Sequence, residues 1–412
     1  MTKPVHVLLV SYEFPPEMAT GGIGSYMNHL ALLLNNHHFK VTVFSATLHN
    51  KNVSLVEREH CKNYLIPAPT SPIFREKVLN LFKELSGDLI FDVMESPEVG
   101  ACALEIKKEF PNMPLVVKLH TPGVLITKIN RTYQPRITKL RYVAGSLKKG
   151  KLDLGYWSKK AKQKEDDPEY QISALADILI SPSYALKEWA EDFWSLKNKN
   201  IRVIPNPFTL RDSLLKSPVS PRKKQICFVG KLSVLKGMMT FTSAIKLILN
   251  KYPDYSIILV GRDEIENNTS IKAWMQNQLR PYLQQIIFAG VLSTTDLEKV
   301  YTESTIAVFP SLWENYPTVV LEAMATGVAI AASNRGGIPE IIENNKTGEL
   351  FNPMRPAAIF KAVDRLLKND IHRIALAENA RRKVVDLQRG LLESETIARL
   401  FSSLASSKNE RE

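Results

Sequence analysis

The chain has 412 residues, of which 44% are hydrophobic and 23% are charged, as in a soluble globular protein with room for two or three domains. No stretch of eighteen uncharged apolar residues occurs, which excludes a membrane-spanning helix. The three cysteines, Cys61, Cys102 and Cys227, lie far apart, so we expect reduced thiols in the core of a cytoplasmic protein rather than a metal site.

The net charge of +12 is concentrated in one segment. Between Lys128 and Lys164, twelve lysines and arginines accompany the single acid Asp153, and the rest of the chain carries only about +1. An excess spread over the whole surface would indicate general binding of polyanions, whereas a local excess predicts one positively charged face.

Strand and helix patterns alternate through the first half of the chain. Helical periodicity is visible in Ser25–Asn36 and Val99–Glu109. Repeated strand–helix–strand units predict a mostly parallel sheet with helices on both faces. The expected strands are Val5–Ser11, Val41–Phe44, Leu89–Met94, Leu115–His120 and Ile178–Ile180.

A proline-rich stretch divides the two halves. Ile201–Pro207 ends the first half, and the run that follows to Pro221 indicates an interdomain linker. The strand–helix alternation then begins again, which predicts an α/β protein with Rossmann-like, doubly wound domains at 1–208 and 222–390 and a helix within 391–412. The expected elements of the second domain are the strands Gln225–Val229, Ser256–Val260, Ile286–Ala289 and Ile306–Phe309 and the helix Met239–Leu249.

The stretch from Phe309 to Ile342 carries the strongest functional pattern. It predicts a buried strand, a loop, a helix that Thr318 caps and Gly327 ends, a second buried strand and a Gly-Gly turn. Its loop and the start of its helix hold two carboxylates, Glu314 and Glu322. Ligands bind at the carboxyl edge of such sheets. A helix start suits a phosphate, and carboxylates accept hydrogen bonds from sugar hydroxyls.

These carboxylates, with seven residues between them, lie within PSLWEN…VVLEAMATG…GG and resemble the E-x7-E signature of the family 4 glycosyltransferases. The resemblance implies a retaining enzyme with the GT-B fold, two Rossmann-like domains facing each other across a cleft. It implies that Glu314, with Asn315 and Tyr316 beside it, contacts the donor sugar, and that Glu322 contacts the nucleotide ribose. It also implies that Glu393–Leu404 returns to the first domain. The alternative is two surface acids, one of them favoured by the helix dipole.

A glycine-rich loop, Gly21 to Gly24, separates the first strand from the first helix. Glycines there let the backbone approach a ligand, and the helix start favours an anion, although a tight turn would need the same residues. The spacing does not match the dinucleotide fingerprint, so we do not infer NAD. The resemblance places Gly22 and Gly24 beside the donor phosphates.

Two lysines follow the first strand of the second domain. Lys231 and Lys236 lie in the sequence GKLSVLKG, where the family has Gly-Arg-Leu, three residues and Lys-Gly. Two cations in one loop can stabilise the diphosphate of a leaving nucleotide. Lys231 supplies a point charge where the arginine of the family could form two parallel hydrogen bonds to a phosphate. Lys236 matches the family residue and is therefore the stronger candidate for binding the diphosphate. Without the acids downstream, both would be read as solvated loop lysines.

Four further positions follow strands or lie at strand ends. His120 ends the strand LVVKLH, and the resemblance implies that it contacts the donor sugar near the reaction centre. A histidine satisfied by backbone groups is the alternative. Glu95 ends the preceding strand and is a candidate on the acceptor side. The resemblance places Arg262 in the cleft and Val291 where backbone groups meet the base.

The sequence offers no metal or cofactor motif. No Asp-x-Asp pair follows a strand, so we expect metal-independent chemistry, with Lys231, Lys236 and helix ends stabilising the leaving diphosphate. His120 and Glu314 complete the set of residues expected at the reaction centre. No cofactor is expected, because the nucleotide-sugar is a substrate.

The basic segment contains an amphipathic pattern. Ile137, Leu140, Ala144 and Leu147 form a helical stripe among lysines and arginines. This predicts contact with an anionic membrane surface, and a lipid-linked or glycan acceptor would suit the same face. A solvated loop is the alternative. Nucleic acid is not expected as a partner, because the charge is local and no recognition motif accompanies it.

The sequence therefore predicts a retaining glycosyltransferase that moves a sugar from a nucleotide-sugar to an acceptor hydroxyl. The family resemblance makes bacterial surface polysaccharide or glycolipid synthesis its expected setting. We expect a cytoplasmic protein that lies on the inner face of the membrane. Two alternatives remain: another GT-B enzyme, such as a nucleotide-sugar epimerase, and a non-enzymatic protein that binds membranes or polyanions. Donor sugar, base, acceptor, linkage and oligomeric state stay open.

Overall fold

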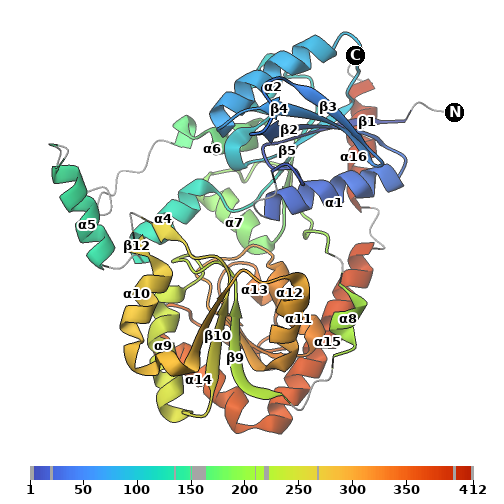
Figure 1. Cartoon of the computed structure of the whole chain (residues 1–412). Coiled ribbons are helices and arrows are strands. Elements are labelled where there is room, and N and C mark those ends of the chain that lie inside the picture. Colours follow the sequence, from blue (N-terminus) through green and yellow to red (C-terminus); the bar gives the residue numbers. More distant parts are fainter. Residues whose placement is uncertain are drawn as a thin grey trace. The chain divides into compact units, whose positions relative to one another are not determined.

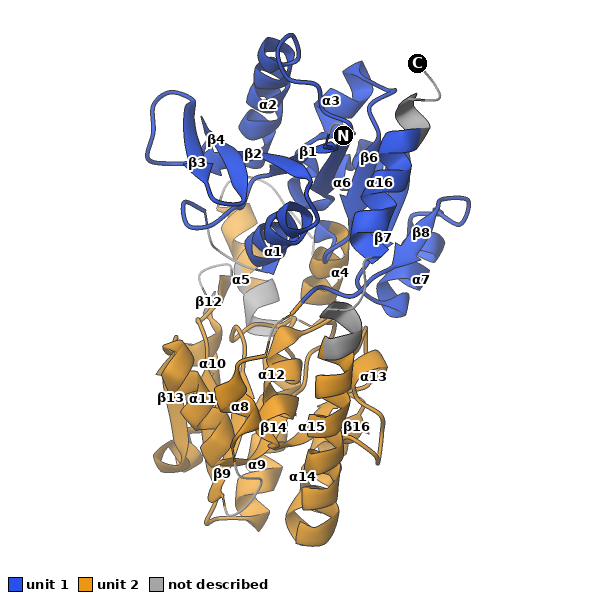
Figure 2. Cartoon of the chain, turned by 90° about the vertical axis from the view of Figure 1, so that its right-hand side faces the viewer, with its two compact units in different colours: residues 1–123, 161–207, 391–412 blue, residues 124–160, 208–390 orange. Residues whose placement is uncertain are grey.

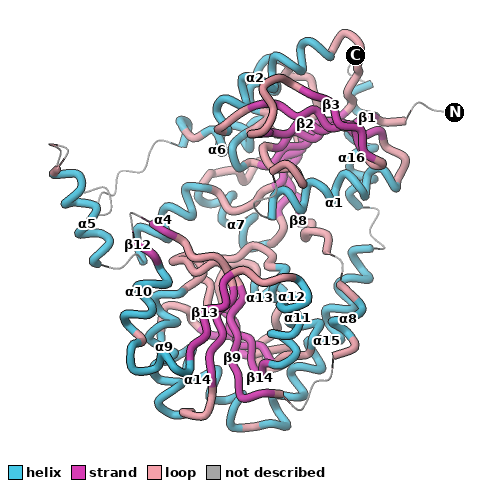
Figure 3. The backbone as a smooth tube through the Cα atoms, in the orientation of Figure 1, coloured by secondary structure: helices cyan, strands magenta, loops and turns pink. Residues whose placement is uncertain are grey.

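The computed structural model describes residues 4–18, 22–133, 136–148, 150, 164–208, 210–217, 222–266, 269–392 and 396–409. The chain forms two compact units (Figure 2). Unit 1 comprises residues 1–123, 161–207 and 391–412, and unit 2 comprises residues 124–160 and 208–390. Each unit is an α/β structure, as the alternating pattern predicts, with its strands enclosed by helices (Figure 3).

Unit 1 is built on an eight-stranded sheet in the order β3-β4-β2-β1-β5-β6-β7-β8 (Figure 1). All neighbours are parallel except the antiparallel pair β3 and β4. The strands are β1 (His6–Ser11), β2 (Lys40–Thr47), β3 (Ser54–Arg58), β4 (Cys61–Pro67), β5 (Val93–Pro97), β6 (Leu115–Lys118), β7 (Ile178–Ser181) and β8 (Ile201–Val203). From the central β1 the chain runs outward first to β2 and later to β5, so strand order reverses between β1 and β5. A ligand site is expected at such a reversal.

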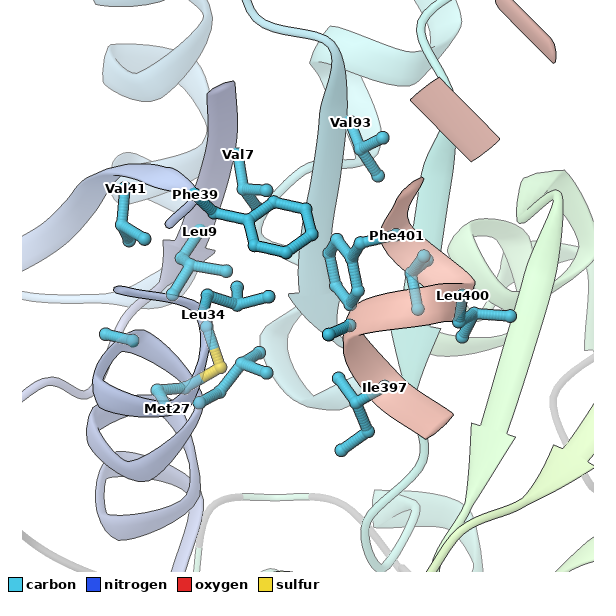
Figure 4. Packing of buried hydrophobic residues seen from close by; sticks show 14 of the residues in the cluster. Val7, Leu9, Met27, Leu34, Phe39, Val41, Val93, Ile397, Leu400 and Phe401 are labelled. Atoms are coloured by element: carbon cyan, nitrogen blue, oxygen red, sulfur yellow. The ribbon is translucent and has the colours of Figure 1, made fainter. Parts of the chain in front are cut away.

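The helices of unit 1 join these strands. They are α1 (Gly22–Asn36), α2 (Ser71–Leu85), the 3-10 turn η1 (Val99–Ala101), α3 (Leu104–Glu109), the 3-10 turn η2 (Lys164–Asp166), α6 (Pro168–Leu175), α7 (Tyr184–Phe193) and α16 (Thr396–Asn409). The last helix, α16, packs on the sheet beside α1 (Figure 4). Phe401 and Ile397 of α16 share one buried cluster with Val7 and Leu9 of β1 and Met27 of α1. Burial of these apolar side chains fixes both helices on the sheet.

Unit 2 is built on a six-stranded parallel sheet in the order β13-β10-β9-β14-β15-β16. Strand order reverses between β9 and β14. The strands are β9 (Lys223–Val229), β10 (Ser256–Val260), β13 (Ile286–Gly290), β14 (Ser304–Phe309), β15 (Ala329–Ser333) and β16 (Glu349–Phe351), with β11 (Ile265–Glu266) and β12 (Thr269–Ser270) as a separate ribbon. Every side chain of β14 and β15 is buried, as expected for continuous apolar runs in a sheet covered on both faces.

The helices of unit 2 connect and cover this sheet. They are α5 (Arg136–Leu147), α8 (Asp212–Leu215), α9 (Met238–Lys251), α10 (Ile271–Gln278), the 3-10 turn η3 (Arg280–Gln285), α11 (Thr294–Glu303), α12 (Thr318–Thr326), α13 (Ile338–Ile341), α14 (Pro356–Lys368) and α15 (Asp370–Leu392). Helix α4 (Gly123–Tyr133) begins at the last residue of the first segment of unit 1.

Three local predictions differ from the structure. The expected helix Val99–Glu109 is split into η1 and α3, because Gly100 and Ala101 have φ angles of 77° and 49°. Thr318 is the first residue of α12 and not its cap. Pro317 holds the cap position, and no side chain caps the helix. The expected strand Leu89–Met94 lies later, at β5. By contrast, the prediction that Gly327 ends α12 is confirmed, with φ of 65°.

The cysteine prediction is confirmed for the thiols themselves. Cys61, Cys102 and Cys227 are all free and buried. Burial raises the pKa of Cys61 to about 11 and the pKa values of the other two to about 12, so their thiols stay protonated near neutral pH.

Candidate active site

In unit 2, the predicted donor-site residues lie in the loops at the carboxyl edge of the sheet. The loop from Gly230 to Gly237 follows β9, and the loop from Pro310 to Pro317 follows β14. Since β9 and β14 flank the reversal of strand order, these loops border the place where α/β sheets bind ligands. The first leads into α9 and the second into α12, so two helix starts point their N–H groups toward this edge.

Glycines hold the loops of this edge in contact. A Cβ at Gly237 would lie 1.9 Å from the carbonyl oxygen of Pro310, and one at Gly336 would lie 2.1 Å from that of Glu314. Both glycines also have positive φ angles, of 76° and 62°. The Glu314 carbonyl accepts the N–H of Gly337 at 2.8 Å. Only glycine fits at such approaches, so Gly237 and Gly336, the latter in the Gly-Gly turn that the sequence predicts, fix the position of the Glu314 loop.

Glu314 and Lys236 are brought together across the reversal. Lys236 Nζ donates to Glu314 Oε1 at 2.5 Å, and Ser311 Oγ donates to the same oxygen at 2.8 Å. The side chains of Lys236 and Glu314 are 24% and 14% exposed, so both are mostly buried but open to a ligand. A lysine ammonium has three donors. Lys236 can therefore keep its bond to Glu314 while it donates to a phosphate.

Glu322 lies on α12 and is half-buried. Burial raises the pKa of its carboxyl group, the neighbouring charge of Arg211 opposes the shift, and Glu298 adds to it. Arg211 and Glu298 form an ion pair of 3.0 Å. A partly buried carboxylate with this surrounding can accept hydrogen bonds from vicinal hydroxyls.

Two half-buried arginines hold the C-terminal end of α12. Arg381 donates from Nε to the carbonyl of Ala325 and from Nη2 to that of Thr326, at 2.9 and 2.6 Å. Arg222 Nη2 donates to the Thr326 carbonyl at 2.7 Å. Cations at this end satisfy the free carbonyls and complement the helix dipole. The helix that carries Glu322 is therefore fixed at the end away from the site.

The other donor-side predictions lie on the same edge. Lys231 and Arg262 are exposed, and their loops are joined by the bond from Leu232 N–H to the Arg262 carbonyl at 2.9 Å. Val291 follows β13 with its side chain 71% exposed. The remaining two residues follow Glu314: Asn315 Oδ1 accepts from Trp313 Nε1 at 2.7 Å, and Tyr316 is buried, which raises its pKa to about 12.

In unit 1, His120 follows β6 and is held by Glu98. The His120 N–H donates to Glu98 Oε1 at 2.6 Å, and His120 Nδ1 lies 3.2 Å from Glu98 Oε2 and 3.1 Å from the Lys118 carbonyl. The Glu98 carboxylate is fully buried. His120 Nε2 is also buried, and no hydrogen-bonding group of the described residues reaches it.

Glu95 belongs to a buried polar network and has no exposed surface. It accepts a hydrogen bond from the Tyr26 hydroxyl at 2.7 Å. Burial raises the pKa of Glu95 to about 7, although Tyr26 and Lys118 oppose the shift. Burial likewise lowers the pKa of Lys118 to about 7, against the nearby Glu95 and Glu98. That Glu95 contacts the acceptor stays a prediction, because the surrounding residues cover its side chain completely in this structure.

The two predicted glycines of the first loop lie inside α1, which begins at Gly22. A Cβ at Gly22 would meet no atom within 4 Å, whereas one at Gly24 would lie 3.5 Å from the Met18 carbonyl oxygen. Residues 19–21, including Gly21, are outside the described part of the chain. The start of α1 lies at the carboxyl end of β1, next to the reversal in unit 1.

Sequence reasoning missed the polar residues that surround His120. Glu98, Lys118 and Tyr26 are all buried. Two signals point to them: a lysine ends the apolar run Leu115–Lys118, and Glu98 follows Glu95 by three residues directly after a strand. Charged residues in such positions need buried partners.

The described residues contain neither a metal-binding cluster nor a membrane-spanning helix. No group of three His, Cys, Asp or Glu side chains among them is placed to hold a metal ion. Every helix within the described ranges is too short or too polar to cross a bilayer. Metal independence stays a prediction.

Comparison with known proteins gives matches along most of the chain. The family profile "Glycosyltransferase Family 4" matches residues 20–211, and "Glycosyl transferases group 1" matches residues 212–383. Spore coat protein SA of Bacillus subtilis is 30% identical over 403 residues, which are 91% of this chain and 93% of that protein. An uncharacterised glycosyltransferase of Methanocaldococcus jannaschii is 29% identical over 168 residues, 41% of this chain and only 42% of the relative's own length.

Solved structures share the fold. Sucrose-phosphate synthase from Thermosynechococcus elongatus superposes with a TM-score of 0.71 at 20% identity, over 97% of this chain and all of that one. At this identity the likeness shows the fold alone.

Proposed function

Because the chain belongs to the family 4 glycosyltransferases and has their GT-B fold, we propose that it moves a sugar from a nucleotide-sugar donor to an acceptor hydroxyl, with retention at the anomeric carbon. The observation that carries the proposal is the Lys236–Glu314 contact of 2.5 Å at the reversal between β9 and β14. It sets a cation for phosphate and a carboxylate for sugar hydroxyls side by side.

The proposed steps follow from these groups. Lys231, Lys236 and the N–H groups at the starts of α9 and α12 stabilise the charge that develops on the leaving diphosphate. Glu314 orients the donor sugar, and Glu322 accepts from the ribose hydroxyls. The acceptor hydroxyl attacks the face that the diphosphate leaves, and the departing phosphate takes its proton. No step uses a metal ion, in keeping with the sequence prediction.

We also propose that the acceptor is a glycan or a lipid-linked molecule and that α5 lies on an anionic membrane surface, as in the synthesis of bacterial surface polysaccharide or glycolipid. In the described part of this helix, Leu140 and Leu147 are 60% and 56% exposed. Two exposed leucines within a segment of net charge +11 support a surface that takes up lipid.

A thermal-shift screen tests the donor site. UDP, GDP, ADP and their common sugar conjugates are added to the whole chain without metal and again with EDTA. A ligand that binds only the folded state raises the melting temperature. We expect one nucleotide to raise the melting temperature, and we expect Glu322→Gln and Lys236→Ala each to reduce that rise. Each variant should weaken nucleotide binding by about 1–3 kcal/mol, the scale of a lost charged hydrogen bond.

Two control variants remove the same charges as Lys236→Ala and Glu322→Gln, but at positions elsewhere in unit 2. Lys224→Ala removes a lysine paired with Asp254, and Glu303→Gln removes a carboxylate paired with Lys223. Both should leave the shift intact. Transfer with the identified donor, read by NMR of the product's anomeric proton, then tests retention. Absence of any shift, together with tight binding to anionic vesicles, would instead favour the non-enzymatic alternative.

A further inference from the structure

The ring of His120 has acceptors on one side only. Nδ1 faces Glu98 Oε2 at 3.2 Å and the Lys118 carbonyl at 3.1 Å. Neither atom can donate while Glu98 is ionised, so Nδ1 must carry a proton to satisfy them. In the neutral imidazole, the lone pair then resides on Nε2. Within the described residues no group occupies that lone pair, although the atom is buried.

The Glu98 carboxylate fixes both the main chain and the ring of His120. Oε1 accepts from the His120 N–H at 2.6 Å while Oε2 faces the ring. Glu98 is itself fixed, because its own N–H donates to the Lys118 carbonyl at 3.2 Å. The turn that follows it has two residues in the left-handed region, Gly100 and Ala101. A buried non-glycine residue with positive φ is costly, and such backbone is often found at functional sites.

A second carboxylate ties the two turns around this pair. Glu169 of α6 accepts from the Gly123 N–H at 2.7 Å and from the Gly100 N–H. The turn after Glu98 and the turn after His120 are therefore joined through one side chain. The Tyr26 ring meets the His120 ring edge-on, with 5.7 Å between the ring centroids. Lys118 Nζ lies 5.0 Å from the Tyr26 centroid, and the Tyr26 hydroxyl donates to Glu95.

From this geometry we propose that Glu98 is the positioning residue for His120, holding its Nδ1–H tautomer so that Nε2 accepts a hydrogen bond from a substrate hydroxyl. The inference rests on the proposed function and names the chemistry that His120 offers there. A sugar or acceptor hydroxyl has a proton to donate, whereas a phosphate oxygen does not. The arrangement thus selects a polyol group rather than the diphosphate as the partner of His120.

Glu98→Gln tests the proposal with almost no change in shape. The His120 N–H can only donate, so the amide oxygen must turn toward it. The amide NH₂ then faces Nδ1 and favours the tautomer that has lost its Nδ1 proton. Nε2 becomes a donor, as when an amide replaces the carboxylate behind a catalytic histidine. We expect kcat/KM for transfer to fall roughly ten- to hundredfold, the scale of one hydrogen bond lost at a buried polar group.

The tautomer itself is read by long-range ¹H–¹⁵N NMR of the whole ¹⁵N-labelled chain near pH 8, with the His120 signals identified by their loss in His120→Gln. Wild type should show protonated Nδ1, and Glu98→Gln should show protonated Nε2. A wild-type His120 that carries its proton on Nε2 overturns the proposal without any variant. So does a Glu98→Gln spectrum unchanged from wild type, because the Lys118 carbonyl alone would then hold the tautomer.

Glu349→Gln is the matched control. Glu349 is also fully buried and also faces a histidine, with Oε1 3.2 Å from His372 Nε2, but it lies in unit 2 away from the loops of the site. Its variant should leave the His120 tautomer and the transfer rate unchanged. The nucleotide-induced thermal shift should survive Glu98→Gln, because that site is in unit 2. If no donor is transferred at all, the proposed function fails, while the NMR result still decides the tautomer.

Discussion

At the scale of single residues, glycines decide how closely the loops of the donor site approach one another. Gly336→Ala places a methyl group where the Glu314 carbonyl now lies, 2.1 Å away, at a φ of 62°. The Glu314 loop must shift. We expect the free energy of unfolding to fall by about 1–3 kcal/mol, and nucleotide-sugar affinity to fall with it, measured by urea denaturation and by calorimetric titration.

Gly87→Ala provides the comparison for that variant. A Cβ at Gly87 would meet no atom within 4 Å. Replacement there should be neutral or slightly stabilising, because alanine restricts the unfolded chain. Equal losses of stability in both variants would mean that the close approach at Gly336 has no special role.

The sequence predicts the residues of unit 2 better than those of unit 1. Lys236 and Glu314 belong to motifs whose spacing can be recognised in a single sequence, and the structure places Lys236 Nζ 2.5 Å from Glu314 Oε1. The pairing of His120 with Glu98 depends on β5 and β6 being neighbours and on the turn after Glu98. Neither fact can be predicted from periodicity, because a single sequence does not reveal the order of strands in a sheet or the φ angle of a residue.

At the scale of elements, the same limit appears in the helices. The apolar spacing of Val99–Glu109 predicts one helix, but the backbone at Gly100 and Ala101 breaks it. The tertiary bonds of Glu98 and Glu169 outweigh local helix preference there. In α1, the helix begins at Gly22, three residues before the expected start, because glycine at a helix start is tolerated where it is avoided inside.

Helix α5 gives the prediction that belongs to this scale. Leu140 and Leu147 are exposed, so a double change to serine removes apolar surface without opening a core. We expect binding to vesicles of anionic lipid to weaken about tenfold, the effect of losing roughly 1.4 kcal/mol of apolar burial. Co-sedimentation with vesicles at low and high salt measures it, and salt should weaken the wild type through its basic residues.

Leu175→Ser is the control for α5. Leu175 is 41% exposed on α6, outside the basic segment, and its replacement should leave vesicle binding unchanged. If the α5 double variant binds as tightly as wild type, the helix does not contribute its apolar side chains to a membrane, and the membrane proposal for α5 is wrong.

At the scale of the whole molecule, alternation of strands and helices is enough to predict two doubly wound sheets, but it does not order them. The reversal between β1 and β5 in unit 1 and the reversal between β9 and β14 in unit 2 each bring candidate residues of that unit to one edge of its sheet. Long-range hydrogen bonds through buried polar groups then add detail that no local pattern contains. Unit 1 has several such groups, and they make its stability depend on pH.

Glu169 is the best placed of these groups to measure. Burial raises its pKa from the ordinary value of 4.5 to about 7, the charge of Glu98 adds to the shift, and the Gly123 N–H opposes it. Between those pH values the folded chain holds a proton on Glu169 that the unfolded chain has released. The free energy of unfolding therefore decreases as pH rises from about 4.5 to about 7, and the loss is complete above that range.

Glu169→Gln should remove this decrease, because the amide does not titrate. Urea denaturation of both proteins at pH 5 and pH 7.5 gives a double difference, which we expect at about 1–3 kcal/mol in the sense that wild type loses more stability on going to the higher pH. The titration of Glu95 also lowers the free energy of unfolding as pH rises, whereas that of Lys118 raises it above about pH 7. Both groups are present in wild type and variant, so their effects cancel in the double difference. An equal decrease in wild type and variant would show that Glu169 is ionised throughout, and that its bond to Gly123 is held by a carboxylate and not by the acid.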